Sequence, residues 1–117
     1  MDTITSVDVF SALAQVTRLD AFRLLVRHEP QGLPAGEIAR LLAVPHNTMS
    51  THLAVLSRSG LIRSEKRGRS IIYRAELEQV RALVSFLLTD CCAGNPDVCG
   101  PLIAELTPCC LPEAQNA

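Results

Sequence analysis

The stretch Val44–Arg74, VPHNTMSTHLAVLSRSGLIRSEKRGRSIIYR, changes its hydrophobic period half-way along. In the first half, the apolar residues Met49, Leu53 and Leu56 recur at spacings of four and three, which predicts an amphipathic helix. Gly60 is expected to end this helix, because glycine readily adopts the left-handed conformation that follows a helix C-terminus. The opposite face carries short polar side chains, so we expect it to face away from the core.

Two β-compatible runs, LIRSEK and SIIYRA, follow Gly60, and the residues RGR separate them. The pattern predicts a β-hairpin that turns near Gly68. The tip of this hairpin is basic because it contains Lys66, Arg67 and Arg69. A shorter helical segment, AGEIARLLA, precedes the helix of the first half. Two short helices joined by a tight turn and followed at once by a basic hairpin are typical of a winged helix-turn-helix.

Two further helices are predicted near the N-terminus. In SVDVFSALAQV, residues 6–16, and in TRLDAFRLLVRHE, residues 17–29, apolar residues recur at helical spacing. Ser6 and Thr17 are the expected N-caps. The residues expected to face the core from these helices and from AGEIARLLA are Val7, Phe10, Leu13, Ala14, Leu19, Phe22, Leu25, Val26, Ile38, Leu41 and Leu42.

A last helix is predicted over residues 76–90, ELEQVRALVSFLLTD. Its apolar residues cover roughly 200° of the circumference at about 100° per residue, which is wider than the single stripe of a surface helix. A chain of 117 residues offers little material to surround such a helix, so a second subunit is expected to cover the surplus face. The predicted fold is therefore mainly α with a small β-hairpin, a winged helix-turn-helix that forms a homodimer through its first and last helices.

The composition predicts one small domain. With 117 residues, 48% of them apolar and 20% charged, the chain can form a single hydrophobic core. No apolar run approaches the ~20 residues that cross a membrane, and no basic segment precedes an apolar stretch at the N-terminus, so we expect a cytoplasmic protein. The net charge of −1 conceals a basic segment, because residues 40–75 contain seven Arg and Lys residues against Glu65 alone. Such a segment predicts a polyanionic partner, with a merely solvated face as the alternative.

The residues STHLAVLSRSGLIRSEKRGRSIIYR resemble the ArsR/SmtB family of metal-responsive winged-helix repressors. The positions that match the family pattern are Ser50, His52, Leu53, Leu56, Gly60, Leu61, Ile62, Gly68 and Tyr73. FSALAQVTRLDAFRLL, residues 10–25, resembles the opening helices of the same family. The resemblance spans about residues 7–90 and implies a homodimer that binds double-stranded operator DNA when it is free of inducer.

The resemblance places the second helix of the motif in the major groove and the wing along the backbone or the minor groove. The candidate DNA-binding residues are Asn47, Thr48, Ser50, Thr51 and His52 in the helix, and Lys66, Arg67 and Arg69 in the wing. Short polar side chains can bond base edges and phosphates, while the longer basic side chains contact phosphates. His52 has an alternative role, because a histidine beside Leu53 could instead orient the helix against its neighbours.

All five cysteines lie in the last 27 residues: Cys91, Cys92, Cys99, Cys109 and Cys110. A reducing cytoplasm favours ligands or sensors over disulfides, and a bridge between the adjacent Cys91 and Cys92 would be strained because their Cα atoms are only ~3.8 Å apart. Three thiolates suit trivalent arsenic or antimony, whereas zinc prefers four ligands. The spacing resembles that of arsenic repressors with a C-terminal thiol site. We therefore expect Cys91, Cys92 and Cys99 to bind the metalloid, with Cys109 and Cys110 as accessory candidates.

The other inducer sites of the family lack their ligands here: AGEIARLLA has no Cys-Val-Cys run, and the last helix has no histidine. The expected function is an arsenite- or antimonite-responsive repressor with As(III) or Sb(III) as inducer and no organic cofactor. Residues 1–92 would form its DNA-binding and dimerisation domain and residues 93–117 a cysteine-containing extension. Two alternatives are a methylated trivalent arsenical held by two thiols and thiol redox sensing. An enzyme is not expected, because no C-x-x-C accompanies a βαβ pattern and no Cys-x₅-Arg loop is present.

Overall fold

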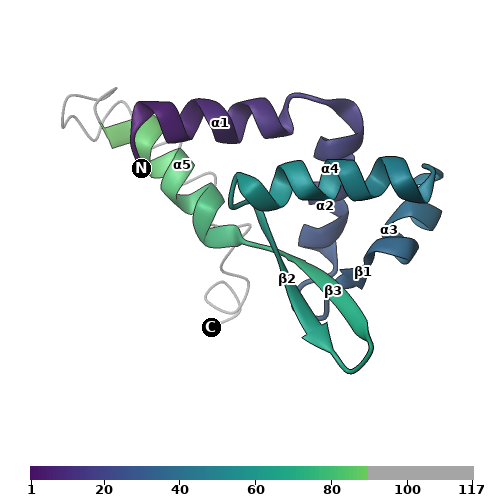
Figure 1. The fold of residues 1–117 in the computed structure, drawn as a ribbon. Coiled ribbons are helices and arrows are strands. Elements are labelled where there is room, and N and C mark those ends of the chain that lie inside the picture. Colours follow the sequence, from purple (N-terminus) through teal and green to yellow (C-terminus); the bar gives the residue numbers. More distant parts are fainter. Residues whose placement is uncertain (90–117) are drawn as a thin grey trace. The chain divides into compact units, whose positions relative to one another are not determined.

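The computed structural model describes residues 1–89, and residues 1–83 form one compact unit. Its elements are α1 (Thr3–Leu13), α2 (Val16–Arg27), β1 (Leu33–Pro34), α3 (Ala35–Leu42), α4 (His46–Arg58), β2 (Ile62–Arg67), β3 (Ser70–Ala75) and α5 (Leu77–Thr89) (Figure 1). The described part beyond this unit, Val84–Thr89, continues α5. The predicted class, mainly α with a small β-hairpin, is confirmed. The predicted boundary between residues 92 and 93 lies outside the described residues.

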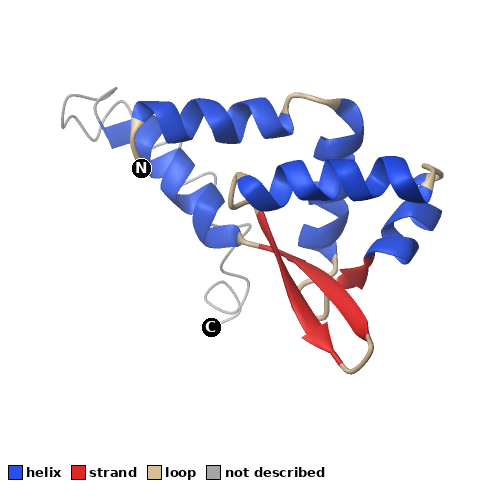
Figure 2. Ribbon diagram, in the orientation of Figure 1, coloured by secondary structure: helices blue, strands red, loops and turns tan. Residues whose placement is uncertain are grey.

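The strands form one small antiparallel sheet in the order β1-β3-β2 (Figure 2). β2 and β3 make the predicted hairpin, in which Arg67 pairs with Ser70. β1 is a third strand that the sequence did not indicate, because it is only two residues long. It pairs with the outer edge of β3, where Leu33 lies opposite Tyr73. The wing is therefore anchored to the chain segment that connects α2 with α3.

The core lies where α1, α2, α3, α4 and the first part of α5 meet. The largest fully buried side chains are Val9, Leu25, Ile38, Met49, Leu53, Leu56 and Leu61. The apolar stripe predicted for α4, which consists of Met49, Leu53 and Leu56, is therefore confirmed. Since all three side chains are fully buried, they fix which face of α4 points outward.

Of the four residues predicted to face the core from the first helix, Leu13 packs against the core, whereas Val7, Phe10 and Ala14 are exposed, so most of the predicted stripe is wrong. Ser6, Val9 and Ala12 are the buried residues of this helix, whereas Val7 and Phe10 are 58% and 44% exposed. Ser6 is not the N-cap either, because α1 begins at Thr3 after the cap residue Asp2. Both faces of α1 carry apolar residues at helical spacing, so periodicity alone could not tell which of them packs inside the subunit.

Three more residues expected in the core are exposed. Leu19, Val26 and Leu41 are 42%, 38% and 43% exposed. In α2 and α3 the buried faces include the small residues Ala21 and Ala39. With these faces packed inside, a larger neighbouring residue of each helix faces solvent. The N-cap of α2 is Gln15 and not Thr17, since the Gln15 side chain accepts a hydrogen bond from the backbone N–H of Arg18.

The predicted end of α4 at Gly60 is confirmed. The Gly60 N–H donates to the carbonyl of Ser57 and the Leu61 N–H donates to that of Leu56, the pair of bonds that defines a Schellman motif. Gly60 has a φ of +81°, which residues with a side chain rarely adopt. Leu61 is fully buried, so the motif carries the chain from α4 directly back into the core.

Candidate DNA-binding surface

The polar side of α4 forms the first part of the candidate surface. Asn47, Thr48, Ser50 and Thr51 are all exposed, because the buried stripe turns this side away from the core. The Thr51 hydroxyl donates to the carbonyl of Asn47 at 3.3 Å, one turn earlier in the helix. Four of the five predicted helix residues therefore lie together on the solvent-facing part of α4, where their hydroxyl and amide groups can reach a nucleic acid.

His52 differs from these four residues because it is only half-exposed. Its Nδ1 lies 3.4 Å from Nη1 of Arg18 on α2. This contact agrees with the alternative role of His52, in which the ring orients α4 against a neighbouring helix. Only one of the two ring nitrogens, Nδ1, takes part in it. The same contact leaves Nε2 to serve another partner.

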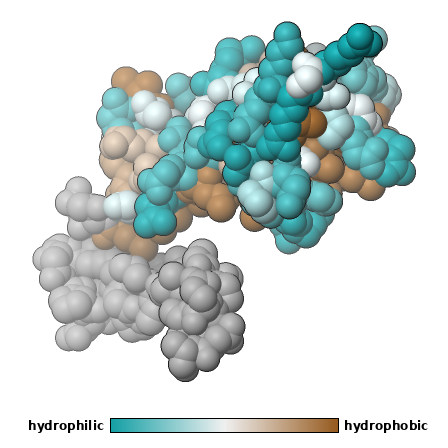
Figure 3. Space-filling view, turned by 90° about the horizontal axis from the view of Figure 1, so that it is seen from below, coloured by the Kyte–Doolittle hydropathy of each residue, from teal (hydrophilic) through white to brown (hydrophobic). Residues whose placement is uncertain are grey.

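The wing supplies the second part of the surface. Gly68 has a φ of +63° at the first position of the two-residue loop between Arg67 and Ser70, as a type II′ hairpin turn requires. Lys66, Arg67 and Arg69 are all exposed at this tip. Figure 3, which views the molecule from below, shows a mostly hydrophilic surface on the part of the chain that the structure describes.

The three basic wing residues are not equivalent. Arg67 donates to the carbonyl of Gln31 at 2.9 Å and to the carboxylate of Glu65 at 2.9 Å. The hydrogen bond from Arg67 lowers the pKa of the Glu65 carboxyl, and the charge of Arg74 acts in the same direction. Lys66 and Arg69 have no such ion pair among residues 1–89, so their charges are the ones available to a polyanion.

Four of the seven basic residues in the segment 40–75 form ion pairs, three of them with carboxylates that lie outside this segment. Arg40 pairs with Glu37, Arg63 with Glu76, Arg67 with Glu65, and Arg74 with Glu29. Within residues 1–89, the basic side chains of this segment without an ion pair are Arg58, Lys66 and Arg69. The charge count of the sequence therefore overstates the surface charge that DNA would meet.

Arg58 is a candidate contact that residue-by-residue reasoning from the sequence missed. It lies in the last turn of α4 and is exposed. It follows Thr51 by seven residues and Asn47 by eleven, spacings that place all three on one side of a helix with 3.6 residues per turn. That spacing is the signal by which it could have been found.

The predicted thiol site lies outside the described residues, since all five cysteines fall between residues 91 and 110. Residues 1–89 contain no cluster of three or more His, Cys, Asp or Glu side chains that could hold a metal ion. In the same part of the chain no helix is long and apolar enough to span a membrane.

Comparison with known proteins assigns this architecture to a family. A family model of a helix-turn-helix domain, HTH_20, matches residues 13–65, from the end of α1 to β2. The "HTH-type transcriptional regulator KmtR" of Mycobacterium tuberculosis is 37% identical over 78 residues, which are 67% of this chain and 58% of KmtR. The chain thus spans less than two thirds of that relative.

Two solved structures extend the comparison. An "ArsR-like Transcriptional Regulator" from Rhodococcus sp. RHA1 has a TM-score of 0.65 and 25% identity, and the match covers 97% of this chain and 93% of that one. A structure described as a "Possible transcriptional regulator for arsenical resistance" is 30% identical with a TM-score of 0.57, covering 68% of this chain and 83% of that one. The chain belongs to the ArsR family of winged-helix transcriptional regulators.

Membership of the ArsR family confirms the resemblance seen in the sequence. Because the winged helix-turn-helix is a DNA-binding fold, the exposed face of α4 and the wing are the candidate DNA-binding elements. The matched relatives are described as transcriptional regulators, which agrees with the expectation that the chain is not an enzyme.

Proposed function

We propose that this ArsR-family protein is a repressor that binds operator DNA as a homodimer and releases it when arsenite or antimonite binds its C-terminal cysteines. The observation that carries the DNA-binding part is the arrangement of α4 and the wing. Asn47, Thr48, Ser50 and Thr51 are exposed together on one helix, while Lys66 and Arg69 at the wing tip lack ion pairs within residues 1–89.

In the proposed complex α4 lies in the major groove, where amide and hydroxyl groups bond base edges and phosphates. Lys66 and Arg69 contact phosphates, and this contact gives the affinity its salt dependence. Arg67 contributes less, since Glu65 already neutralises part of its charge.

The homodimer is supported by an apolar stripe on α1. Ile4, Val7 and Phe10 recur every three residues and are 77%, 58% and 44% exposed. Contiguous exposed apolar side chains on a small domain mark an interaction surface. A second copy of the chain is the occupant that we propose, because a two-fold axis brings the same stripe of both subunits together and buries both.

The inducer is proposed from the chemistry of the thiols. Cys91, Cys92 and Cys99 offer three soft thiolates within nine residues, the donor set that trivalent arsenic or antimony prefers. The similarity to a structure described as a possible regulator for arsenical resistance supports the same inducer class. Binding would lower DNA affinity through a coupling of about 1–3 kcal/mol, or roughly 5- to 150-fold.

The alternatives differ in how many thiols take part. A methylated trivalent arsenical needs only two of them. A redox sensor would instead form a disulfide between cysteine pairs, and non-reducing electrophoresis after mild peroxide would detect it.

The decisive experiment is a fluorescence-anisotropy titration of arsenite, and separately of zinc, into the reduced protein bound to a labelled duplex. The duplex is one that the wild type enriches from a randomised library. We expect near-stoichiometric arsenite, and not zinc, to release the wild-type protein. The Cys99→Ser variant should bind the duplex equally well and resist release.

A control variant and a second arsenical make the result interpretable. The Cys109→Ser/Cys110→Ser variant should respond like the wild type, since these thiols are accessory. Release by zinc, or an unchanged arsenite response of Cys99→Ser, would contradict the proposed trio. A Cys99→Ser variant that resists arsenite but still responds to methylarsenite would favour the two-thiol alternative.

A further inference from the structure

Arg18 on α2 connects two other helices. Its Nε donates to the carbonyl of Ala12 at 2.6 Å and its Nη2 to the carbonyl of Ser11 at 3.3 Å, both in the last turn of α1. Its Nη1 lies 3.4 Å from Nδ1 of His52 on α4. One half-buried guanidinium therefore joins the end of α1 to the helix that carries the candidate DNA contacts.

The bonds to α1 follow from helix chemistry. The last carbonyls of an α-helix lack intrahelical partners and carry a partial negative charge. A guanidinium with several N–H groups in a fixed planar fork can bond two such carbonyls at once. The Ser11 carbonyl also accepts from the backbone N–H of Ala14. Arg18 is in turn held in place because its backbone N–H donates to the Gln15 side chain at 2.9 Å.

The contact with His52 fixes a tautomer. Arginine can only donate, so Nδ1 must accept, and an accepting Nδ1 requires the proton of the neutral ring to lie on Nε2. Within residues 1–89, Nε2 has no hydrogen-bond partner. His52 lies on the same side of α4 as Thr48, four residues earlier and exposed. The ring therefore presents an N–H donor beside the polar face of the helix.

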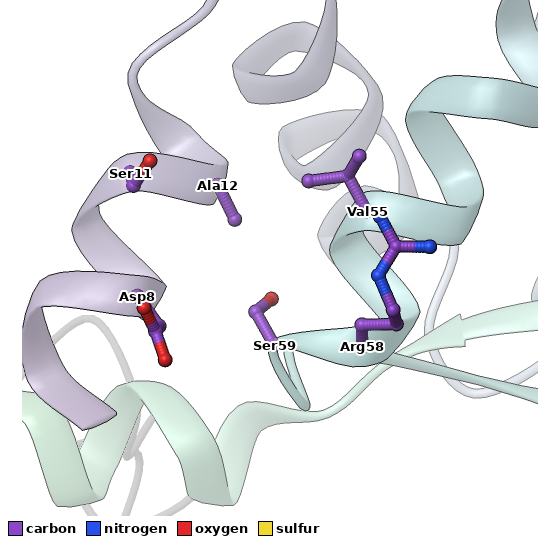
Figure 4. Close-up of a pocket in the computed structure, with 6 residues that line it drawn as sticks. All are labelled: Asp8, Ser11, Ala12, Val55, Arg58 and Ser59. Atoms are coloured by element: carbon purple, nitrogen blue, oxygen red, sulfur yellow. The ribbon is translucent and has the colours of Figure 1, made fainter. Parts of the chain in front are cut away.

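The space between α1 and α4 is only partly filled by side chains. An open cavity of about 230 Å³ lies there, lined by Asp8, Ser11, Ala12, Val55, Arg58 and Ser59. Figure 4 shows the lining side chains of the two helices on opposite sides of this cavity. Arg18 contacts both of these helices, α1 through the carbonyls of Ser11 and Ala12 and α4 through His52.

From this geometry we infer that Arg18 is a positioning residue for DNA binding, which holds His52 so that Nε2–H donates to a phosphate or base oxygen of the DNA. The inference rests on the proposed DNA-binding function. His52 is then a DNA contact whose orientation depends on α2. Arg18 also provides a physical link between α1, the helix proposed to form the dimer, and α4.

A double-mutant cycle tests the inference. Binding to the enriched duplex is measured for the wild type, Arg18→Met, His52→Asn and the double variant, each at several salt concentrations. Asn at position 52 can still accept from Arg18 through Oδ1, but its shorter side chain places no donor at the position of Nε2. We expect Arg18→Met to weaken binding about 10-fold in the wild-type background and less than about 2-fold in the His52→Asn background.

The salt dependence separates positioning from contact. Loss of a direct phosphate contact by an arginine would reduce the slope of log K against log salt by about 0.9. We expect Arg18→Met to leave this slope unchanged. A reduced slope, or equal losses of affinity in the two backgrounds, would overturn the inference.

A variant that retains the charge covers the case in which Arg18→Met fails to fold. Arg18→Lys keeps the positive charge and an ammonium donor group but not the planar fork, so it should reproduce the background-dependent loss of affinity. A loss that is the same with His52 and with His52→Asn would mean a structural role only. Failure of the wild type to enrich any duplex would instead contradict the proposed function itself.

Discussion

The Nη2 of Arg74 on β3 lies 2.7 Å from Oε1 of Glu29, a residue 45 positions earlier in the chain. Nε of the same guanidinium reaches the second carboxylate oxygen at 3.2 Å, so the pair is bidentate. The two side chains are only 20% and 19% exposed. This ion pair joins the root of the wing to the loop after α2, and it raises the pKa of Arg74.

Arg74→Met should therefore lower the thermal unfolding midpoint, because it leaves Glu29 half-buried without its partner. Arg81→Met is the matched control, since Arg81 pairs with Glu78 where the side chains are 79% and 74% exposed. Differential scanning fluorimetry should show a clear decrease for Arg74→Met and almost none for Arg81→Met. Equal shifts would mean that the partly buried pair contributes no more than the exposed one.

The wing residues should differ in their effect on the salt dependence of DNA binding. Replacing both Lys66 and Arg69 with alanine should reduce the slope of log K against log salt by about 1.8 per wing, since each phosphate contact contributes about 0.9. Arg67→Ala should reduce it by much less, because Glu65 and Gln31 already engage its guanidinium. A full reduction for Arg67→Ala would show that it leaves these partners on DNA.

Phe10→Glu should dissociate the dimer by placing a carboxylate on each side of the two-fold interface. The expected change is a loss of dimer affinity of at least about 10-fold, measured by analytical ultracentrifugation over a concentration series. Leu41→Glu is the matched control, because Leu41 on α3 is 43% exposed and Phe10 is 44% exposed. An unchanged oligomeric state of Phe10→Glu would place the dimer interface elsewhere.

Gly60→Ala should decrease the free energy of unfolding by about 1–3 kcal/mol. Its φ is +81°, and an added Cβ would lie 2.8 Å from Nε2 of Gln79, which donates to the carbonyl of Ser59. Gly36→Ala should instead stabilise by about 0.5–1 kcal/mol, because Gly36 lies within α3 and its nearest neighbour to an added Cβ is 3.9 Å away. Urea denaturation of the two variants should give changes of opposite sign.

Glu65 should contribute to the acid side of the stability profile. Its folded pKa lies below the ordinary value of 4.5, so the stabilisation is present above that value and is lost as the pH falls through the folded pKa. Glu65→Gln should therefore flatten the decline in unfolding midpoint between about pH 5 and pH 3. In an Arg67→Met background the same substitution should have a smaller effect, because the bond from Arg67 is the main cause of the shift. If Glu65→Gln has the same effect in both backgrounds, Arg74 rather than Arg67 is the main cause of the lowered pKa of Glu65.

Local features of the sequence were sufficient for the architecture of the DNA-binding unit. The spacing of Met49, Leu53 and Leu56 set the buried side of α4, and Gly60 and Gly68 marked a helix end and a hairpin turn. These signals can be read because helical spacing and a positive φ depend on residues close together in the chain. The exposed polar face of α4 follows from the same stripe. The thiol site remains a prediction from sequence alone.

The tertiary structure determined which of several chemically similar residues are buried, which are ion-paired and which contact a distant helix. It buried Val9 and left Val7 and Phe10 outside, since the helices packed against α1 select one of its two apolar faces. It paired Arg67 and left Arg69 without an ion pair within residues 1–89. It also brought Arg18 to His52 across 34 residues of sequence. Such pairings depend on where distant elements meet, and that information is absent from the spacing of residues along one element.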